Sequence, residues 1–117
     1  PLNVREKTLL RAKLSDGLYE ISGLINNNCL DSTLLLMDEL VFEALMGYYE
    51  LHCWWKASRK KVLPDIRIRD YDFYKLVEKF LLTGDTFGKY EYLKQILQKV
   101  LGLAGGEIKE YILIWKE

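Results

Sequence analysis

The sequence predicts an all-α protein, folded as an antiparallel up-and-down bundle of four to five helices. Two observations support this prediction. Apolar residues recur at spacings of three and four through most of the chain, and the segments between these stretches are about four to twelve residues long. With 117 residues, half of them hydrophobic, the chain is large enough for one core and is expected to form a single domain, residues 1–117.

The first helix is expected from about Val4 to Leu24. Asn3 and Glu6 are placed like the two members of a capping box. The apolar stripe at helical spacing consists of Leu10, Leu14, Leu18, Ile21 and Ile25. Three consecutive asparagines, at positions 26–28, are expected to end this helix.

The second helix is expected to be the longest, beginning near residues 31–33, which are all competent N-caps, and running to Trp55 or a little beyond. It is apolar on nearly every side. Three carboxylates interrupt this surface along one narrow line: Glu39, Glu43 and Glu50. At about 100° per residue they fall within roughly 40° of one another. A helix with so much apolar surface is expected to be the central member of the bundle.

The basic segment 58–69 is expected to be a connector, because Pro64 holds the residue before it in an extended conformation. Asp70 is expected to cap a third helix, which ends at the Thr-Gly-Asp sequence of residues 83–85. The core-facing residues of this third helix are Phe73, Leu76, Val77 and Phe80.

A fourth helix is expected from about Phe87 to Leu103, before the glycines at positions 105 and 106. Residues 107–117 fit a helix or a strand equally well. A short fifth helix is favoured, since no other part of the chain offers a strand with which this segment could pair.

Charge is balanced overall but clustered locally. Seventeen basic residues match seventeen acidic ones, so no net field attracts nucleic acid or an anionic membrane. Cys29 and Cys53 are too few for a disulfide scaffold and are expected to be buried free thiols, as in a cytoplasmic protein. A signal peptide is not expected, because no charged segment followed by an apolar one opens the sequence, and a membrane span is not expected, because acidic residues interrupt the longest apolar segment.

The line of glutamates is the first candidate for a ligand site. Carboxylates beside an aromatic ring suit a cationic ligand, through charge pairing and cation–π contact. The candidate substrate-binding residues are Glu39, Glu43, Glu50 and Trp54, since Trp54 continues the same line if the helix extends that far. The alternative is that the line is only the narrow solvated face that every bundle helix keeps.

The basic residues after the second helix are a second candidate. They could contact phosphates or a partner domain, and they comprise Lys56, Arg59, Lys60, Lys61, Arg67 and Arg69. The alternative is an ordinary charged connector at the C-terminus of a helix. Nucleic acid is not the favoured partner.

Metal and catalytic sites are not expected. The only histidine, His52, lies about 200° from Glu50 on a helix, so the two cannot share a metal, and His52 is interpreted as partly buried and hydrogen-bonded. His52 and Cys53 diverge by about 100° and do not form a nucleophile–base pair. No phosphate-binding glycine loop is present, and no cofactor is expected.

The order of features carries a resemblance. It includes RAKLSDGLYEISGLI in the first helix, the acidic second helix, WWKASRKKVLPDI, and RDYDFYKLVEKFLLTGD. This pattern resembles the helical domain of the HEPN and kanamycin-nucleotidyltransferase C-terminal superfamily. The resemblance implies a bundle that forms homodimers and works with a nucleotidyltransferase domain, in cis or in trans. By position, it implies that Glu39, Glu43 and Glu50 face a cationic substrate and that the basic connector contacts nucleotide phosphates or the partner domain.

The catalytic signatures associated with this superfamily are missing. HEPN ribonucleases carry an Arg followed closely by a His, and His52 has no Arg at that spacing. Nucleotidyltransferases need a Gly-Ser turn before an Asp-x-Asp pair on a strand, whereas Asp70 and Asp72 open a helix. The expected function is therefore a non-catalytic accessory or substrate-binding domain. The alternative is a structural homodimerisation module, because three Trp, eight Tyr and four Phe are more aromatic surface than one small core easily buries.

Overall fold

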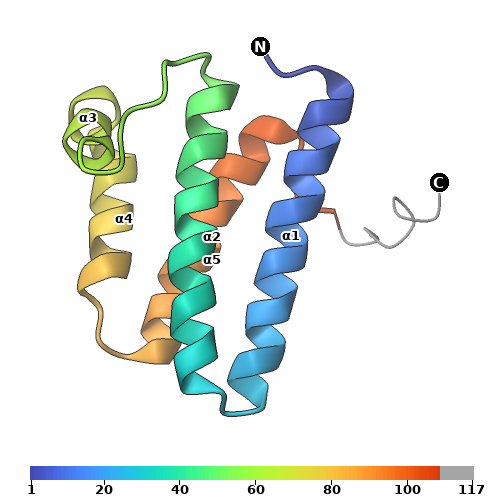
Figure 1. Cartoon of the computed structure of the whole chain (residues 1–117), viewed down its shortest axis with the longest axis vertical. Helices are drawn as coiled ribbons and strands as arrows, with labels where there is room; N and C mark the ends of the chain where they lie inside the picture. Colours follow the sequence, from blue (N-terminus) through green and yellow to red (C-terminus); the bar gives the residue numbers. More distant parts are fainter. Residues whose placement is uncertain (109–117) are drawn as a thin grey trace.

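The computed structural model describes residues 1–108, which contain five α-helices and no strand. The all-α bundle predicted from the sequence is thus confirmed over these residues. The helices are α1 (Val4–Asn26), α2 (Leu30–Leu51), α3 (Val62–Arg69), α4 (Tyr71–Leu82) and α5 (Thr86–Ala104) (Figure 1). None of them is long and apolar enough to cross a membrane.

The four longer helices alternate in direction along the chain, as an up-and-down bundle requires. In Figure 1, α1 descends, α2 ascends, α4 descends and α5 ascends, while the short α3 lies beside the upper end of α4. Within the described chain, α5 packs against α1, α2 and α4, whereas α2 packs against α1 and α5. The helix with the most helical neighbours is therefore α5, and the prediction that the second helix is central was wrong in this respect. Helices α2 and α3 do not pack closely against each other, and hydrogen bonds between side chains join them.

Local sequence signals place several helix ends correctly. The capping box of α1 is present: the Glu6 N–H donates to Asn3 Oδ1 over 2.8 Å, and the Asn3 N–H donates to Glu6 Oε1 over 3.1 Å. Asp70 caps α4 by accepting a hydrogen bond from the Phe73 N–H. Asp85, which was predicted only as part of the end of the preceding helix, also caps α5 by accepting a hydrogen bond from the Gly88 N–H. These ends depend only on residues a few positions apart, which is why the sequence reveals them.

The second helix ends earlier than predicted. It stops at Leu51 because Cys53 has a left-handed backbone conformation, with φ of 57°. The Cys53 N–H then donates to the Glu50 carbonyl and the Trp54 N–H to the Tyr49 carbonyl, which closes the helix end. At its other end, α2 begins at Leu30 with no side-chain cap, so the three candidate caps at residues 31–33 lie inside the helix.

The segment predicted as a connector contains a helix. Residues 62–69 form α3, and Pro64 lies in its first turn. The first four N–H groups of a helix have no intrahelical acceptor, so a proline costs little there. The two cysteines were also placed wrongly: Cys53 is exposed and Cys29 is only half-buried. The expected fifth helix of residues 107–117 lies almost wholly outside the described residues.

One cluster of buried side chains holds the helices together. Leu14 and Ile21 come from α1, and Phe73 and Phe80 from α4. The largest contributions come from α2 and α5, and they include Met37, Leu40, Val41, Ala44, Leu45, Tyr48, Tyr49, Leu93, Ile96, Leu97, Val100 and Leu101. Because α2 turns this apolar face inward, its acidic residues are left on the opposite, solvent-facing side.

Candidate functional site

Two adjoining depressions lie along the acidic side of α2. The narrower one, of about 130 Å³, lies between α1 and α2, and the wider one, of about 350 Å³, lies on the far side of the same glutamates. Glu39 and Glu43 line both. We call the two depressions together the acidic groove. Its lining comprises Gly17, Glu20, Ile21, Leu35, Leu36, Asp38, Glu39, Leu40, Phe42, Glu43 and Arg59.

Close contact between α1 and α2 brings acids from both helices into this groove. A Cβ atom added at Gly17 would lie 2.8 Å from Leu40 Cδ1, so a larger residue there would force the end of the Leu40 side chain to move. Glu20 lies about one helical turn after Gly17 and therefore reaches the same groove as Glu39 and Glu43. Four carboxylates, from Glu20, Asp38, Glu39 and Glu43, gather on one surface.

Most of these carboxylates have no cationic partner. Glu43 lies 3.8 Å from Lys13 Nζ, and both side chains are well exposed, so water screens this pair. Glu20, Asp38 and Glu39 form no ion pair with any residue in the described chain. The groove is therefore a locally negative surface on a chain whose net charge is zero.

One cation from the basic connector returns to the groove. Arg59 lies over the ring of Phe42, with 4.7 Å between its Cζ and the ring centroid, and both residues line the wider depression. Its guanidinium forms no ion pair within 4 Å of any described carboxylate. The contact is thus an exposed cation–π contact in acidic surroundings.

The structure separates the other two predicted substrate-binding residues from the groove. Glu50 lies 3.7 Å from Lys56 Nζ and does not line the groove. Trp54 is not on α2, because that helix ends at Leu51, and its ring stacks on His52 with the centroids 4.3 Å apart. His52 is exposed, and its imidazole makes no hydrogen bond within residues 1–108, so its interpretation as a partly buried histidine with a hydrogen-bonded side chain was wrong. Glu39 and Glu43 stay together, whereas Glu50 and Trp54 lie near the end of α2.

The six basic candidates are dispersed over separate contacts. Lys56 faces Glu50, and Arg59 lies in the acidic groove. Arg67 lies over the ring of Tyr74 at 5.6 Å, and Arg69 lies over Trp54 at 4.8 Å. The two that remain, Lys60 and Lys61, are exposed and make no ion pair with the described residues. The structure therefore holds at least four of the six cations at different places.

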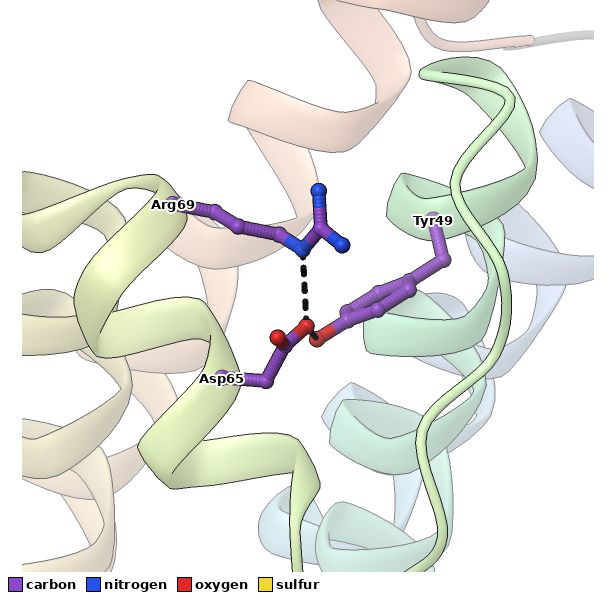
Figure 2. Close-up of polar contacts among 3 residues, drawn as sticks. All are labelled: Tyr49, Asp65 and Arg69. Carbon is purple, nitrogen blue, oxygen red and sulfur yellow. Dashed lines mark hydrogen bonds and ion pairs between the residues drawn. The ribbon is translucent and has the colours of Figure 1, made fainter.

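Two tyrosine–aspartate pairs join the upper end of α2 to the start and end of α3. Figure 2 shows the first pair, in which the Tyr49 hydroxyl donates to Asp65 Oδ2 and Arg69 Nε donates to the same oxygen over 2.9 Å. In the second pair, the Tyr48 hydroxyl donates to Asp70 Oδ2. Lys99 Nζ, from α5, lies 3.5 Å from that oxygen. Sequence reasoning missed both pairs, because neither can be seen without knowing where α3 lies.

Each pair fixes the protonation of its two members. Burial raises the pKa of Tyr48 and of Tyr49, and the hydrogen bonds to the aspartates raise it further. The hydrogen bond from Tyr49, together with Arg69, lowers the pKa of Asp65. Burial opposes ionisation of Asp70, but hydrogen bonds from Tyr48 and the Phe73 N–H and the charge of Lys99 lower its pKa overall. At neutral pH the tyrosines are neutral donors and the aspartates are ionised acceptors.

The groove offers charge, an aromatic face and shape. Over residues 1–108, no group of three or more His, Cys, Asp or Glu side chains is arranged to hold a metal ion. Sequence reasoning found Glu39 and Glu43 from their helical spacing, and it missed Glu20, which needs the packing of α1 on α2.

Comparisons with models of protein families, with curated proteins and with solved structures give no significant match.

Proposed function

We propose that this chain is a helical accessory domain without catalytic activity of its own, which binds a cationic ligand in the acidic groove and acts with a nucleotidyltransferase domain or partner. The observation that carries the proposal is the set of four carboxylates from two helices, three of them without an ion-pair partner in the described chain. Unpaired carboxylates side by side repel one another, and a bound cation relieves that repulsion.

The energetics favour a ligand with several positive charges. An exposed ion pair is worth only about 0.2–1 kcal/mol, so a single ammonium group would bind very weakly. A ligand that engages Glu39, Glu43 and Glu20 together gains several such contacts at the cost of one binding event. Phe42 adds an aromatic face for one of the cationic groups. Polyamines and aminoglycosides have this chemistry.

The partner class comes from the resemblance described for the sequence. Helical domains of that superfamily work beside nucleotidyltransferase domains, and a cationic substrate bound in the groove would be presented to such a domain. Lys60 and Lys61, which are exposed at the start of α3, offer contacts for the partner or for nucleotide phosphates.

Isothermal titration of the full chain with kanamycin, spermidine and ATP tests the proposal. We expect kanamycin and spermidine to bind and ATP alone not to bind. The variant Glu39→Gln/Glu43→Gln should bind kanamycin about tenfold more weakly, because two ion pairs of up to about 0.7 kcal/mol each are lost.

The matched control is Glu50→Gln, which also removes one carboxylate from α2 but outside the groove. Its affinity for kanamycin should equal that of the unaltered chain. Absence of binding to either polycation, or an equal loss in the control and the groove variant, would contradict the proposed function.

Homodimerisation is the second candidate, and a different surface favours it. At the opposite end of the bundle from α3, a depression of about 320 Å³ is lined only by uncharged residues: Ile25, Asn28, Cys29, Leu30, Thr33, Thr86 and Phe87. Phe87 is 66% exposed beside it. Sedimentation of the full chain and of Phe87→Ser at micromolar concentration tests this role, since a strict monomer in both cases would rule it out.

A further inference from the structure

The basic connector folds back along α2 instead of leaving the bundle. Phe42 lies nine residues before the end of α2, which corresponds to about 14 Å along the helix axis. Arg59 lies eight residues beyond that end, and its guanidinium nevertheless reaches the ring of Phe42. The chain between Leu51 and Arg59 therefore runs back toward the acidic groove.

The position of Arg59 matches the position expected for the cation of a ligand. Its guanidinium lies 4.7 Å from the centroid of the Phe42 ring, in the depression that Asp38, Glu39 and Glu43 also line. This observation is independent of the cluster of acids, because Arg59 belongs to a different segment of the chain and contacts the ring of Phe42. The groove thus already holds one cationic group, supplied by the chain itself.

The contact between Arg59 and Phe42 is weak enough for the cation of a ligand to replace it. Arg59 is exposed and has no ion-pair partner in the described chain. Residues 54–58, which precede it, form no regular structure, so few backbone hydrogen bonds on that side have to break when it moves. An exposed cation–π contact of this kind lowers the apparent affinity of a competing cation by about two- to fivefold.

We infer that Arg59 is an autoinhibitory occupant of the acidic groove, which a ligand bearing guanidinium or ammonium groups displaces from Phe42. This inference rests on the proposed function and makes the ligand class more specific: one cationic group takes the place of the Arg59 guanidinium over the ring. Displacement also releases the connector that carries Lys60 and Lys61, so occupation of the groove changes the surface available to a partner.

Titration of kanamycin into full-length variants tests the inference. Arg59→Ala should bind kanamycin about two- to fivefold more tightly than the unaltered chain, because the internal competitor is gone. The matched control is Arg67→Ala, which loses the same charge and a similar contact, 5.6 Å from the ring of Tyr74, at a place outside the groove. Its affinity should not change.

Hydrogen exchange separates displacement from a simple effect of charge. On addition of kanamycin, the hydrogen-bonded amides of this segment in the unaltered chain, those of Cys53, Trp54 and Lys61, should exchange faster, whereas those of Arg59→Ala should already exchange at the faster rate. Equal or weaker binding by Arg59→Ala, or no change in exchange, overturns the inference while the proposed function stands. Absence of binding in every variant overturns both.

Discussion

The two halves of α2 use acidic groups in different ways. At its upper end, Tyr48 and Tyr49 donate to Asp70 and Asp65, and each of these aspartates also has a cation close by. In the acidic groove, Glu20, Asp38 and Glu39 have no ion-pair partner in the described chain. One end of α2 therefore contacts two fully partnered carboxylates from α3 and its C-cap, whereas the groove further along α2 holds a mostly unpartnered set from α1 and α2.

The difference separates structural groups from candidate ligand groups. A buried hydroxyl without an acceptor costs free energy, so Tyr48 and Tyr49, which are buried, require the aspartates that α3 and its end provide. Within residues 1–108, the carboxylates of Glu20, Asp38 and Glu39 form no ion pair that could hold a helix in place, and the one ion pair of Glu43, with Lys13, is exposed. Groups that the fold does not need, gathered on one surface, are the ones available to a ligand.

Removal of the two tyrosine hydroxyls should have the largest effect on stability. The double variant Tyr48→Phe/Tyr49→Phe keeps both rings in the core and loses two hydrogen bonds to ionised aspartates. We expect the free energy of unfolding to fall by about 2–3 kcal/mol, since each such bond is worth roughly 1–1.5 kcal/mol when the aspartate is partly exposed. Urea denaturation followed by circular dichroism measures the change.

The control for this prediction is Tyr74→Phe. Its hydroxyl donates to Glu78 Oε2 over 2.9 Å within α4, so no second helix is held by this bond. We expect little change in the free energy of unfolding. A loss as large as that of the double variant would show that any tyrosine–carboxylate bond matters equally, and that α2 and α3 are not specifically joined by the two pairs.

The stabilisation from these pairs should depend on pH in a predictable direction. The pKa values of Asp65 and Asp70 are lowered from their usual 3.8, so the stability they contribute is present above that pH and is lost as pH falls through the lower values in the folded protein. The pKa values of Tyr48 and Tyr49 are raised from 10.0, so their contribution is lost as pH rises well above 10.

Urea denaturation at about pH 7 and about pH 2 checks the acid side. The stability difference between the unaltered chain and the double variant should be smaller at the lower pH, because an aspartate that becomes protonated no longer accepts a charge-assisted hydrogen bond. A difference that stays constant between the two pH values would mean that the lost hydroxyls matter only through packing.

The sequence predicts those parts of the fold that local rules control. The capping box of Asn3 and Glu6 and the cap at Asp70 both follow from spacings of three residues. The end of α2 could not be foreseen, because it depends on a left-handed conformation at Cys53, a residue that seldom adopts it. Helix α3 was not predicted because a proline disfavours the interior of a helix, whereas Pro64 lies in the first turn of α3, where proline is tolerated.

The acidic groove likewise contains residues that the sequence predicts and residues that only the tertiary structure brings there. Helical spacing puts Glu39 and Glu43 on one surface, and the structure agrees. Glu20 joins them only because Gly17 packs against Leu40, a tertiary contact with no local signal. The position of Arg59 depends on the course of an irregular connector, which no periodicity describes. Sequence reasoning therefore found the part of the groove that lies on one helix and missed the parts that other segments supply.

Neutralising a carboxylate of the acidic groove should have the smallest effect on stability. This result is the sharpest test of the difference between the groove and the two tyrosine–aspartate pairs. Glu39 and Glu43 are one helical turn apart and carry like charges, which destabilises a helix by about 0.2–0.5 kcal/mol. The variant Glu39→Gln should therefore raise the free energy of unfolding by about that amount at low salt. The gain should disappear in about 1 M NaCl, where the repulsion is screened.

A loss of more than about 1 kcal/mol in Glu39→Gln would contradict this view, since it would make the carboxylate part of the structure, as Asp65 and Asp70 are. The expected small rise in the free energy of unfolding would instead show that the fold does not depend on this carboxylate. A carboxylate whose removal stabilises the helix and weakens the binding of a polycation is kept for the ligand and not for the fold, because binding sites commonly retain groups that cost stability. Measured together, the two quantities distinguish a binding surface from a solvated face, for which Glu39→Gln should give the same small gain in stability but leave the binding of a polycation unchanged.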